Sequence, residues 1–252
     1  MKKAYVLLTF FLIALPAHGQ SRDELLKRAG SQTEKFVDNF SLVRSTEQMV
    51  QLKMDSKGKV ALKQTSDYDY VGIVRVSNGI AKVEESRVNK GVPAQNPGES
   101  QLVTSGFATL ILIFHPEFQD SFTFQDAPAE SQSGLRALTF ELKPAARSTT
   151  VFRFRDRNFP VEWKGIAWLD PVSGAVQRIH AAMKNPIGDL GLQLLEADVE
   201  YAPIKFQDVP EPYWLPRTAT VNLETHQQHW KNTHTFRNYA PYTVTTSASV
   251  VP

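Results

Sequence analysis

Alternation of apolar and polar residues in the C-terminal half of the chain is the feature that most restricts its fold. Apolar side chains occupy every second position in residues 138–142, 152–154, 195–201 and 219–223. Successive side chains of a strand point to opposite faces, so each segment has one apolar and one hydrated side. This pattern is typical of an antiparallel sheet with one buried face. Residues 170–174, Asp-Pro-Val-Ser-Gly, predict a hairpin turn between two such strands.

The N-terminal part predicts one helix followed by more strands. Ser21 and Glu24 have the spacing of a capping box, and apolar residues recur at helical spacing over residues 22–41. After this helix the period changes to two. Extended segments are expected over residues 50–54, 59–65 and 70–77, with a turn at Asn78-Gly79. Residues 87–103 contain glycine and proline among polar residues and predict a loop.

Residues 107–114 form an apolar segment whose conformation the periodicity alone does not settle. Its length fits a buried strand, but four of its bulky residues share one helical stripe: Phe107, Leu110, Ile111 and Phe114. Ser105 as a cap and His115-Pro116 as a stop favour a short buried helix.

These elements predict one fold class for the whole chain. Neither a repeat nor a shift in composition divides the sequence, so residues 20–252 are expected to form a single domain. The class is mainly β (α+β), with a large curved antiparallel sheet or incomplete β-barrel. About two helices are expected to pack on its concave face.

Residues 1–19 have the layout of a secretory signal peptide. A cationic start precedes the apolar residues 4–15, and Ala17 and Gly19 are small residues suited to cleavage after Gly19. The apolar part is shorter than the roughly 20 residues that span a bilayer. The sequence therefore predicts an exported bacterial protein, periplasmic or secreted, without a transmembrane segment after cleavage.

Composition then excludes several classes of function. Loss of Lys2 and Lys3 with the signal peptide leaves 26 basic against 26 acidic residues, which provides no basic surface for nucleic acid. The absence of cysteine excludes disulfides, thiolate nucleophiles and thiolate metal sites.

Histidines near the C-terminus are the most suggestive candidates for a metal site. His226, His229 and His234 lie close together in sequence, with Glu224 beside them. On strands, however, His226 and His229 point to opposite faces. The spacing therefore favours three exposed histidines on the polar face of the last hairpin, with no metal or cofactor.

Other polar groups also have an ordinary structural interpretation. Asp67 and Asp69 share a strand face and are expected to be solvated. Arg153, Arg155 and Arg157 form a predicted ladder on one strand, either paired with acidic neighbours or available to a phosphate. A catalytic triad of His115 with Ser105 or Asp120 requires an arbitrary selection among common residues, so the sequence does not support it. No sequence motif of a known catalytic site is present, and no catalytic residue is assigned.

Residues 165–171 and 173–179 resemble a recurring hairpin of periplasmic lipoprotein-carrier (LolA-type) and sigma-regulatory (RseB-type) domains. Residues 107–116, 214–216 and 236–239 resemble a narrower group of secreted bacterial proteins with no established activity. This resemblance implies an incomplete β-barrel whose apolar concave face is covered by helices. It also implies binding of acyl chains or sensing of envelope lipoproteins, by analogy of fold alone.

The leading hypothesis is a non-enzymatic envelope protein that binds a lipid chain or an acylated protein. Its apolar concave face would be lined by six residues: Phe36, Phe40, Phe107, Leu110, Ile111 and Phe114. An alternative is a periplasmic interaction or sensor module whose core is simply filled. A third is an exported hydrolase without a recognisable motif.

Overall fold

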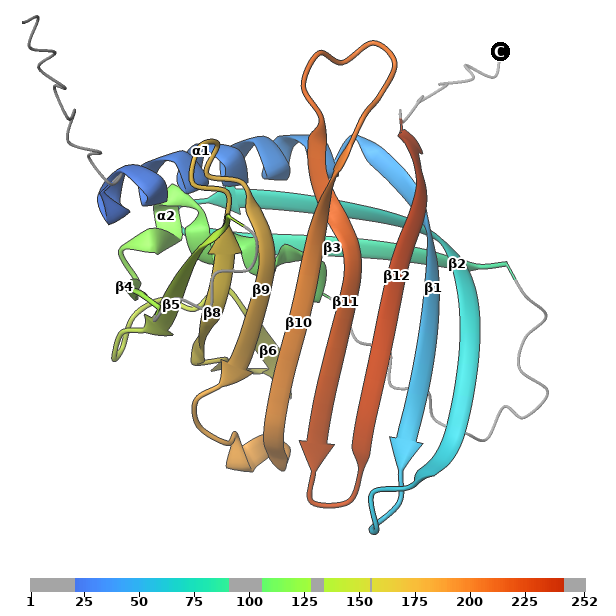
Figure 1. Ribbon diagram of the computed structural model, residues 1–252. Coiled ribbons are helices and arrows are strands. Elements are labelled where there is room, and N and C mark those ends of the chain that lie inside the picture. The colour runs from blue at the N-terminus through green and yellow to red at the C-terminus, as the bar shows by residue number, and fades with distance from the viewer. Residues whose placement is uncertain (1–20, 91–105, 128–133, 155, 243–252) are drawn as a thin grey trace, which may run out of the picture.

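A single curved sheet of ten antiparallel strands dominates the computed structural model (Figure 1). The structure describes residues 21–90, 106–127, 134–154 and 156–242. Within these residues the strand order is β3-β2-β1-β12-β11-β10-β9-β8-β5-β4, with β3 and β4 at the two edges. The predicted class is confirmed, with an open sheet rather than a closed barrel among the described strands.

The bounds of the elements are as follows. The helices are α1 (Arg22–Phe40), the 3-10 helix η1 (Phe107–Phe114), α2 (Pro116–Gln119) and the 3-10 turn η2 (Gly188–Leu190). The first strands are β1 (Val43–Met54), β2 (Val60–Ser77), β3 (Ile80–Asn89), β4 (Phe122–Asp126) and β5 (Arg136–Leu142). The others are β6 (Val151–Phe154), β7 (Arg157–Pro160), β8 (Trp163–Leu169), β9 (Val176–Met183), β10 (Leu192–Ile204), β11 (Tyr213–Thr225) and β12 (His229–Pro241).

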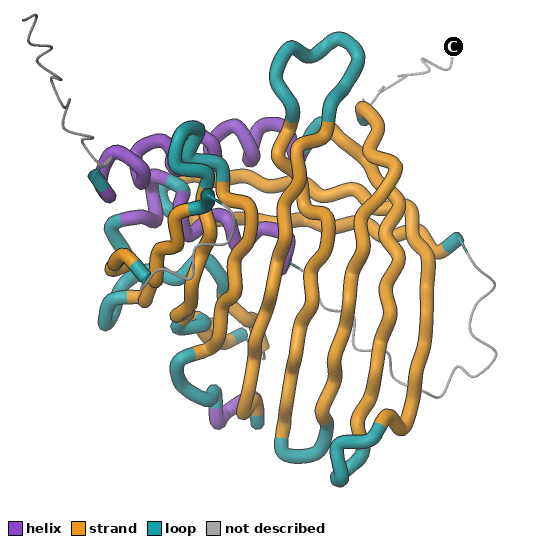
Figure 2. Tube along the Cα trace, viewed as in Figure 1, coloured by secondary structure: helices purple, strands orange, loops and turns teal. Residues whose placement is uncertain are grey.

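The first helix matches its prediction closely. Ser21 caps it by accepting a hydrogen bond at Oγ from the backbone N–H of Glu24, at 3.2 Å. Its apolar stripe buries Leu25, Ala29, Phe36 and Phe40. Figure 2 shows α1, η1 and α2 gathered towards one end of the sheet. These three helices thus cover the inner face of the sheet, which carries its buried apolar side chains.

The long hairpin of β2 and β3 curves across that end until its turn reaches α2 (Figure 1). Asn78 and Gly79 form the predicted turn with φ values of 51° and 65°. The Glu117 carboxylate accepts the backbone N–H of Gly79, and the Arg147 guanidinium donates to the carbonyl of Asn78 at 2.6 Å. The first contact fastens the hairpin to α2, and the second fastens it to the connection between β5 and β6.

Several predicted boundaries in the N-terminal half were wrong. The two expected segments 59–65 and 70–77 form one continuous strand, β2, because residues 60–71 pair with β1 and residues 68–77 pair with β3. Residues 87–89 of the predicted loop extend β3 through pairing with β2. The remaining loop residues 91–103, Ser105 and the signal peptide lie outside the described residues. The buried positions of β1 include Glu47, Met49 and Gln51, so Val50 and Leu52 face outward.

The predicted arginine ladder was also wrong. Arg153 lies on β6, which ends at Phe154, whereas Arg157 begins β7 after the turn between the two strands, so these two arginines do not share one strand. Arg155 lies outside the described residues. Asp156 in this turn has a φ of 60°, a conformation that aspartate tolerates. Arg157 pairs with Asp189 at 2.6 Å.

Gly165 in β8 provides a test of the sheet packing. A Cβ atom at this position would lie 2.0 Å from the carbonyl oxygen of His180 and 2.8 Å from the ring of Phe140. We expect Gly165→Ala to lower the free energy of unfolding by about 1–3 kcal/mol, because the backbone has to shift. Urea unfolding measures this loss. Gly188→Ala is the control, because a Cβ there meets nothing within 4 Å. Equal effects of the two changes would contradict the close packing.

Candidate functional site

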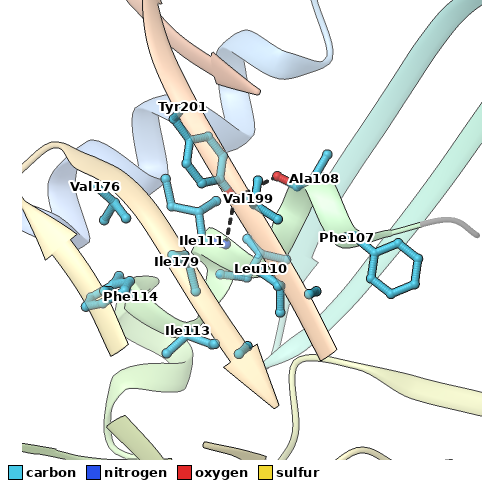
Figure 3. Packing of buried hydrophobic residues seen from close by; sticks show 14 of the residues in the cluster. Phe107, Ala108, Leu110, Ile111, Ile113, Phe114, Val176, Ile179, Val199 and Tyr201 are labelled. Atoms are coloured by element: carbon cyan, nitrogen blue, oxygen red, sulfur yellow. Dashed lines mark hydrogen bonds between the residues drawn. The ribbon is translucent and has the colours of Figure 1, made fainter. Parts of the chain in front are cut away.

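The 3-10 helix η1, here called the plug, covers the apolar part of the inner face. All eight of its residues are buried, as expected for a helix that is apolar on every side. It contacts β9, β10 and β11 (Figure 3). Gly106 precedes it with a φ of 80°. The predicted short buried helix is thus confirmed, with 3-10 geometry.

Tyr201 of β10 fastens the plug to the sheet. Its hydroxyl donates to the carbonyl of Ala108 at 2.9 Å and accepts from the backbone N–H of Ile111 at 3.2 Å (Figure 3). Burial raises the pKa of Tyr201 far above its usual value, so the hydroxyl remains protonated. One side chain therefore satisfies a donor and an acceptor of the plug in a dry environment, where unpaired groups are costly.

The structure brings the six predicted ligand-binding residues into one buried cluster. Each of Phe36, Phe40, Phe107, Leu110, Ile111 and Phe114 is at most 7% exposed. The rings of Phe36 and Phe40 stack at 5.0 Å, and Phe36 meets Tyr201 edge-on at 6.0 Å. Their grouping is as expected, and their role in binding stays a prediction.

Two hollows border the plug and α1, and they differ greatly in volume. A cavity of about 10 Å³ lies at the first residues of the plug, which is room for about one water molecule. It is lined by Glu85, Arg87, Gly106, Phe107, Ala108, Ala219, His234 and Phe236. A larger hollow of about 320 Å³ lies between α1 and the β10–β11 connection. In this conformation the plug packs against β9, β10 and β11, and α1 packs against β2, β11 and the plug.

A group of buried charges, here called the charged cluster, lies next to the plug. It consists of Glu47 on β1, Glu85 and Arg87 on β3, and His234 on β12. Arg87 donates from Nε to Glu47 Oε2 at 2.5 Å and from Nη1 to Glu85 Oε2 at 2.9 Å. His234 Nδ1 lies 2.7 Å from Glu47 Oε1. Glu47 is fully buried and His234 is 2% exposed.

The electrostatics of the cluster keep Glu47 ionised. Burial alone would raise the pKa of Glu47, but hydrogen bonds from His234 and Arg87 outweigh it and hold the pKa below its usual value. Burial likewise disfavours the charged form of Arg87, but the hydrogen bond to Glu47 and the charges of Glu85 and Glu47 raise its pKa. Each charge thus depends on its partners in the cluster.

Glu85 connects the charged cluster to the plug. Its Oε1 accepts the backbone N–H of Gly106 at 3.0 Å and the hydroxyl of Tyr70 at 2.9 Å. Gly106 is the residue before the plug, so the start of the plug is tied to a buried carboxylate. The guanidinium of Arg87 lies 5.0 Å from the centre of the Tyr70 ring.

Sequence reasoning missed this cluster. The prediction of three exposed histidines was wrong for His234, because β12 turns Trp230, Asn232, His234 and Phe236 inward. His226 remains exposed beside Gln193. Glu47 was missed because it belongs to a strand whose apolar residues 50 and 52 suggested the opposite face. Only a long-range pairing, β1 with β12, brings Glu47 and His234 together.

The remaining candidates have structural roles. Asp67 contacts Gln48 at 3.2 Å, and Asp69 pairs with Lys90 at 2.6 Å. His115 ends the plug and also caps α2, since its Nδ1 accepts the backbone N–H of Glu117 at 3.3 Å. Among the described residues, no group of three or more His, Asp or Glu side chains is placed to hold a metal ion.

The fold and site define an open antiparallel sheet whose inner face is closed by a helical plug. No protein-family model matches the sequence, and no curated protein does. Similar solved structures include a LolA superfamily protein from Nitrosomonas europaea, with a TM-score of 0.42 and 10% identity, covering 86% of this chain and 94% of that one. A second similar structure is a putative outer membrane lipoprotein-sorting domain from Vibrio parahaemolyticus. Its TM-score is 0.42 and its sequence identity is 13%, and the match covers 88% of this chain and 93% of that one.

A weaker likeness is to the MucA/MucB complex of Pseudomonas aeruginosa, with a TM-score of 0.22 and 10% identity, covering 86% of this chain and 99% of that one. The descriptions of the first two structures are of the LolA type, which residues 165–171 and 173–179 of this chain also resemble. At these TM-scores the likeness carries no conclusion about what this chain binds. No helix among the described residues is long and apolar enough to cross a membrane.

The Tyr201 hydroxyl allows a direct test of how the plug is held. We expect Tyr201→Phe to lower the free energy of unfolding by about 1–3 kcal/mol, because two buried backbone groups lose their partner. Tyr213→Phe is the control, since Tyr213 is half-buried and lies away from the plug. Chemical denaturation compares the two variants with the parent. A Tyr201→Phe loss no larger than that of the control would contradict the anchoring role.

The charged cluster leads to a pH-dependent prediction. A lowered pKa means that Glu47 contributes stability above the ordinary pKa of 4.5, and this contribution disappears as the pH falls through the lower folded value. We expect Glu47→Gln to cost on the order of 3 kcal/mol at about pH 7, because Arg87 and His234 lose a charged partner. The difference from the parent should shrink towards about pH 3. Urea unfolding across this range measures it, and a constant difference would refute the assignment.

Proposed function

We propose that this protein is an exported, non-enzymatic binder of the apolar chain of a lipid or an acylated protein. The observation that carries the proposal is the plug, a segment that is apolar except for Thr109 and rests on an apolar sheet face. Its hydrogen bonds to the sheet are made by two side chains, Tyr201 and Glu85, through backbone groups of the plug and of Gly106. The rest of its attachment is apolar packing, which a hydrocarbon chain can replace.

Replacement of the plug by a hydrocarbon chain has a favourable and an opposing contribution to the binding free energy. A chain that takes the place of the plug keeps the inner faces of β9 and β10 away from water. Each methylene it buries contributes about 0.8 kcal/mol, and the opposing cost is the movement of the plug and the loss of its contacts. Affinity therefore depends on how firmly Tyr201 holds the plug. The six residues of the buried cluster would then line the binding site.

Export enters the proposal through residues 1–19, whose signal-peptide pattern lies outside the described residues. The proposed site of action is the bacterial periplasm or the medium. Lipoprotein sorting is the suggested role of the Vibrio parahaemolyticus domain. The choice of an apolar ligand for this chain rests on the packing of the plug.

A second candidate, an interaction or sensor module, is favoured by a different observation. The cavity beside the plug measures only about 10 Å³, and the six cluster residues are packed against one another. If the plug never leaves the sheet, this cluster is an ordinary core. Nothing among the described residues favours the third hypothesis, an exported hydrolase.

A binding assay separates the first two candidates. The delipidated mature protein is titrated with an environment-sensitive fluorescent fatty acid, and dodecanoate is used to displace it. We expect saturable binding by the parent. Tyr201→Phe should bind more tightly while being less stable, since loosening the plug lowers the cost of opening. Tyr213→Phe should bind like the parent.

The competing candidate makes the opposite prediction for the same variants. A filled core gives no saturable binding by the folded parent, and Tyr201→Phe then lowers stability without any gain in binding. That combination would reject the proposed function and leave the interaction module.

A further inference from the structure

The inner face of the sheet has two parts of different chemistry. Beneath the plug it is apolar, whereas β1 and β12 contribute buried polar side chains, namely Ser45, Glu47, Gln51, Asn232 and His234. Arg87 and Glu85 of β3 complete the charged cluster. Well-packed hydrophobic residues in place of a buried ion pair are often neutral or stabilising, so a core alone does not require these charges.

The beginning of the plug lies on the boundary between the two parts. The N–H of Gly106 is bound to Glu85, while Phe107 and Ala108 line the small cavity together with Arg87 and His234. A movement of the plug therefore takes a hydrogen-bond donor away from Glu85. It also joins the apolar face to the charged cluster in one continuous surface.

The charges of the cluster determine which group can replace Gly106. Two carboxylates, Glu47 and Glu85, share one guanidinium, Arg87, through hydrogen bonds of 2.5 and 2.9 Å. His234 Nδ1 contacts Glu47, the carboxylate farther from Gly106 in this network. A carboxylate or phosphate placed at the position of the Gly106 N–H would meet Glu85 as a like charge. A positively charged hydrogen-bond donor at this position would instead be attracted by the negative charge of Glu85.

We propose that the charged cluster is a head-group subsite for an ammonium group, carried by an amphiphile whose chain occupies the place of the plug. Glu85 receives the ammonium in place of the Gly106 N–H. Arg87 and Tyr70 hold the Glu85 carboxylate in position by donating hydrogen bonds to it, and Glu47 in turn holds Arg87. This inference rests on the proposed function and specifies its ligand class.

Three probes with the same twelve-carbon chain test the proposal: dodecylamine, dodecanol and dodecanoate. Each displaces the neutral fluorophore N-phenyl-1-naphthylamine from the mature protein at about pH 8, where an alkylamine is protonated and a free carboxylate is ionised. We expect dodecylamine to bind at least about 10-fold more tightly than dodecanoate, with dodecanol between them. Glu85→Gln should reduce this preference to less than about 3-fold, because its neutral amide does not distinguish the two charged head groups.

Glu84→Gln is the matched control. Glu84 is next to Glu85 on β3 but is exposed and pairs with Lys82, so its substitution should leave the preference intact. Equal binding of amine and dodecanoate by the parent would overturn the head-group subsite. So would a preference that survives in folded Glu85→Gln.

The outcomes also separate this proposal from the one on which it depends. Saturable binding of dodecanol without a preference for the amine rejects the subsite and keeps the apolar binding site. Failure of all three probes rejects both. If Glu85→Gln does not fold, the order of affinities of the parent decides, since only an acidic subsite ranks the amine first and dodecanoate last.

Discussion

The fit of one short helix against the inner face of an open sheet is the contact on which this structure depends. A ten-stranded open sheet has an extensive apolar side, and α1 covers only one end of it. The plug supplies much of the remaining cover with eight consecutive buried residues. Because a helix that is apolar on every side has no stable place in water, the sheet and the plug require each other.

The plug is attached at two places by different kinds of interaction. Within the plug, Tyr201 satisfies two backbone groups, the carbonyl of Ala108 and the N–H of Ile111. At its start, Gly106 is held by a carboxylate that belongs to a network of buried charges. Apolar packing thus dominates along the plug, and electrostatic interactions dominate at Gly106. Removal of a single partner affects the second attachment more strongly, since buried charges are costly when unpaired.

The sequence was sufficient for the class of fold and for many of the elements. Local signals explain this success: the cap of α1, the turn at Asn78-Gly79 and the two-residue period of β10 and β11 depend on neighbouring residues only. The helical plug was also predictable, because the stripe of Phe107 and Ile111 and the stop at His115-Pro116 are local. Its anchoring by Tyr201, 90 residues from Ile111, was not.

Errors arose where pairing between distant strands decides the outcome. Residues 50–54 suggest an inward apolar face, yet the register of β1 with β12 turns Glu47 inward to meet His234. Ladder hydrogen bonds to β1 likewise keep β2 extended through a stretch that looked interrupted. The charged cluster therefore lay beyond reach of sequence patterns, although Glu47 and Arg87 are ordinary strand residues when considered singly.

The pairing of β1 with β12 has a consequence for how the chain assembles. The first strand lies in the interior of the sheet and is bonded on one side to the last, with Val43 opposite Pro241. Contacts between such distant residues slow folding, because a long loop has to close before they form. The three-stranded unit of β1, β2 and β3 can pair with the other strands only after β12 has been synthesised. A ribosome that has yet to release β12 therefore holds a molecule in two unjoined halves, each with an unpaired strand edge.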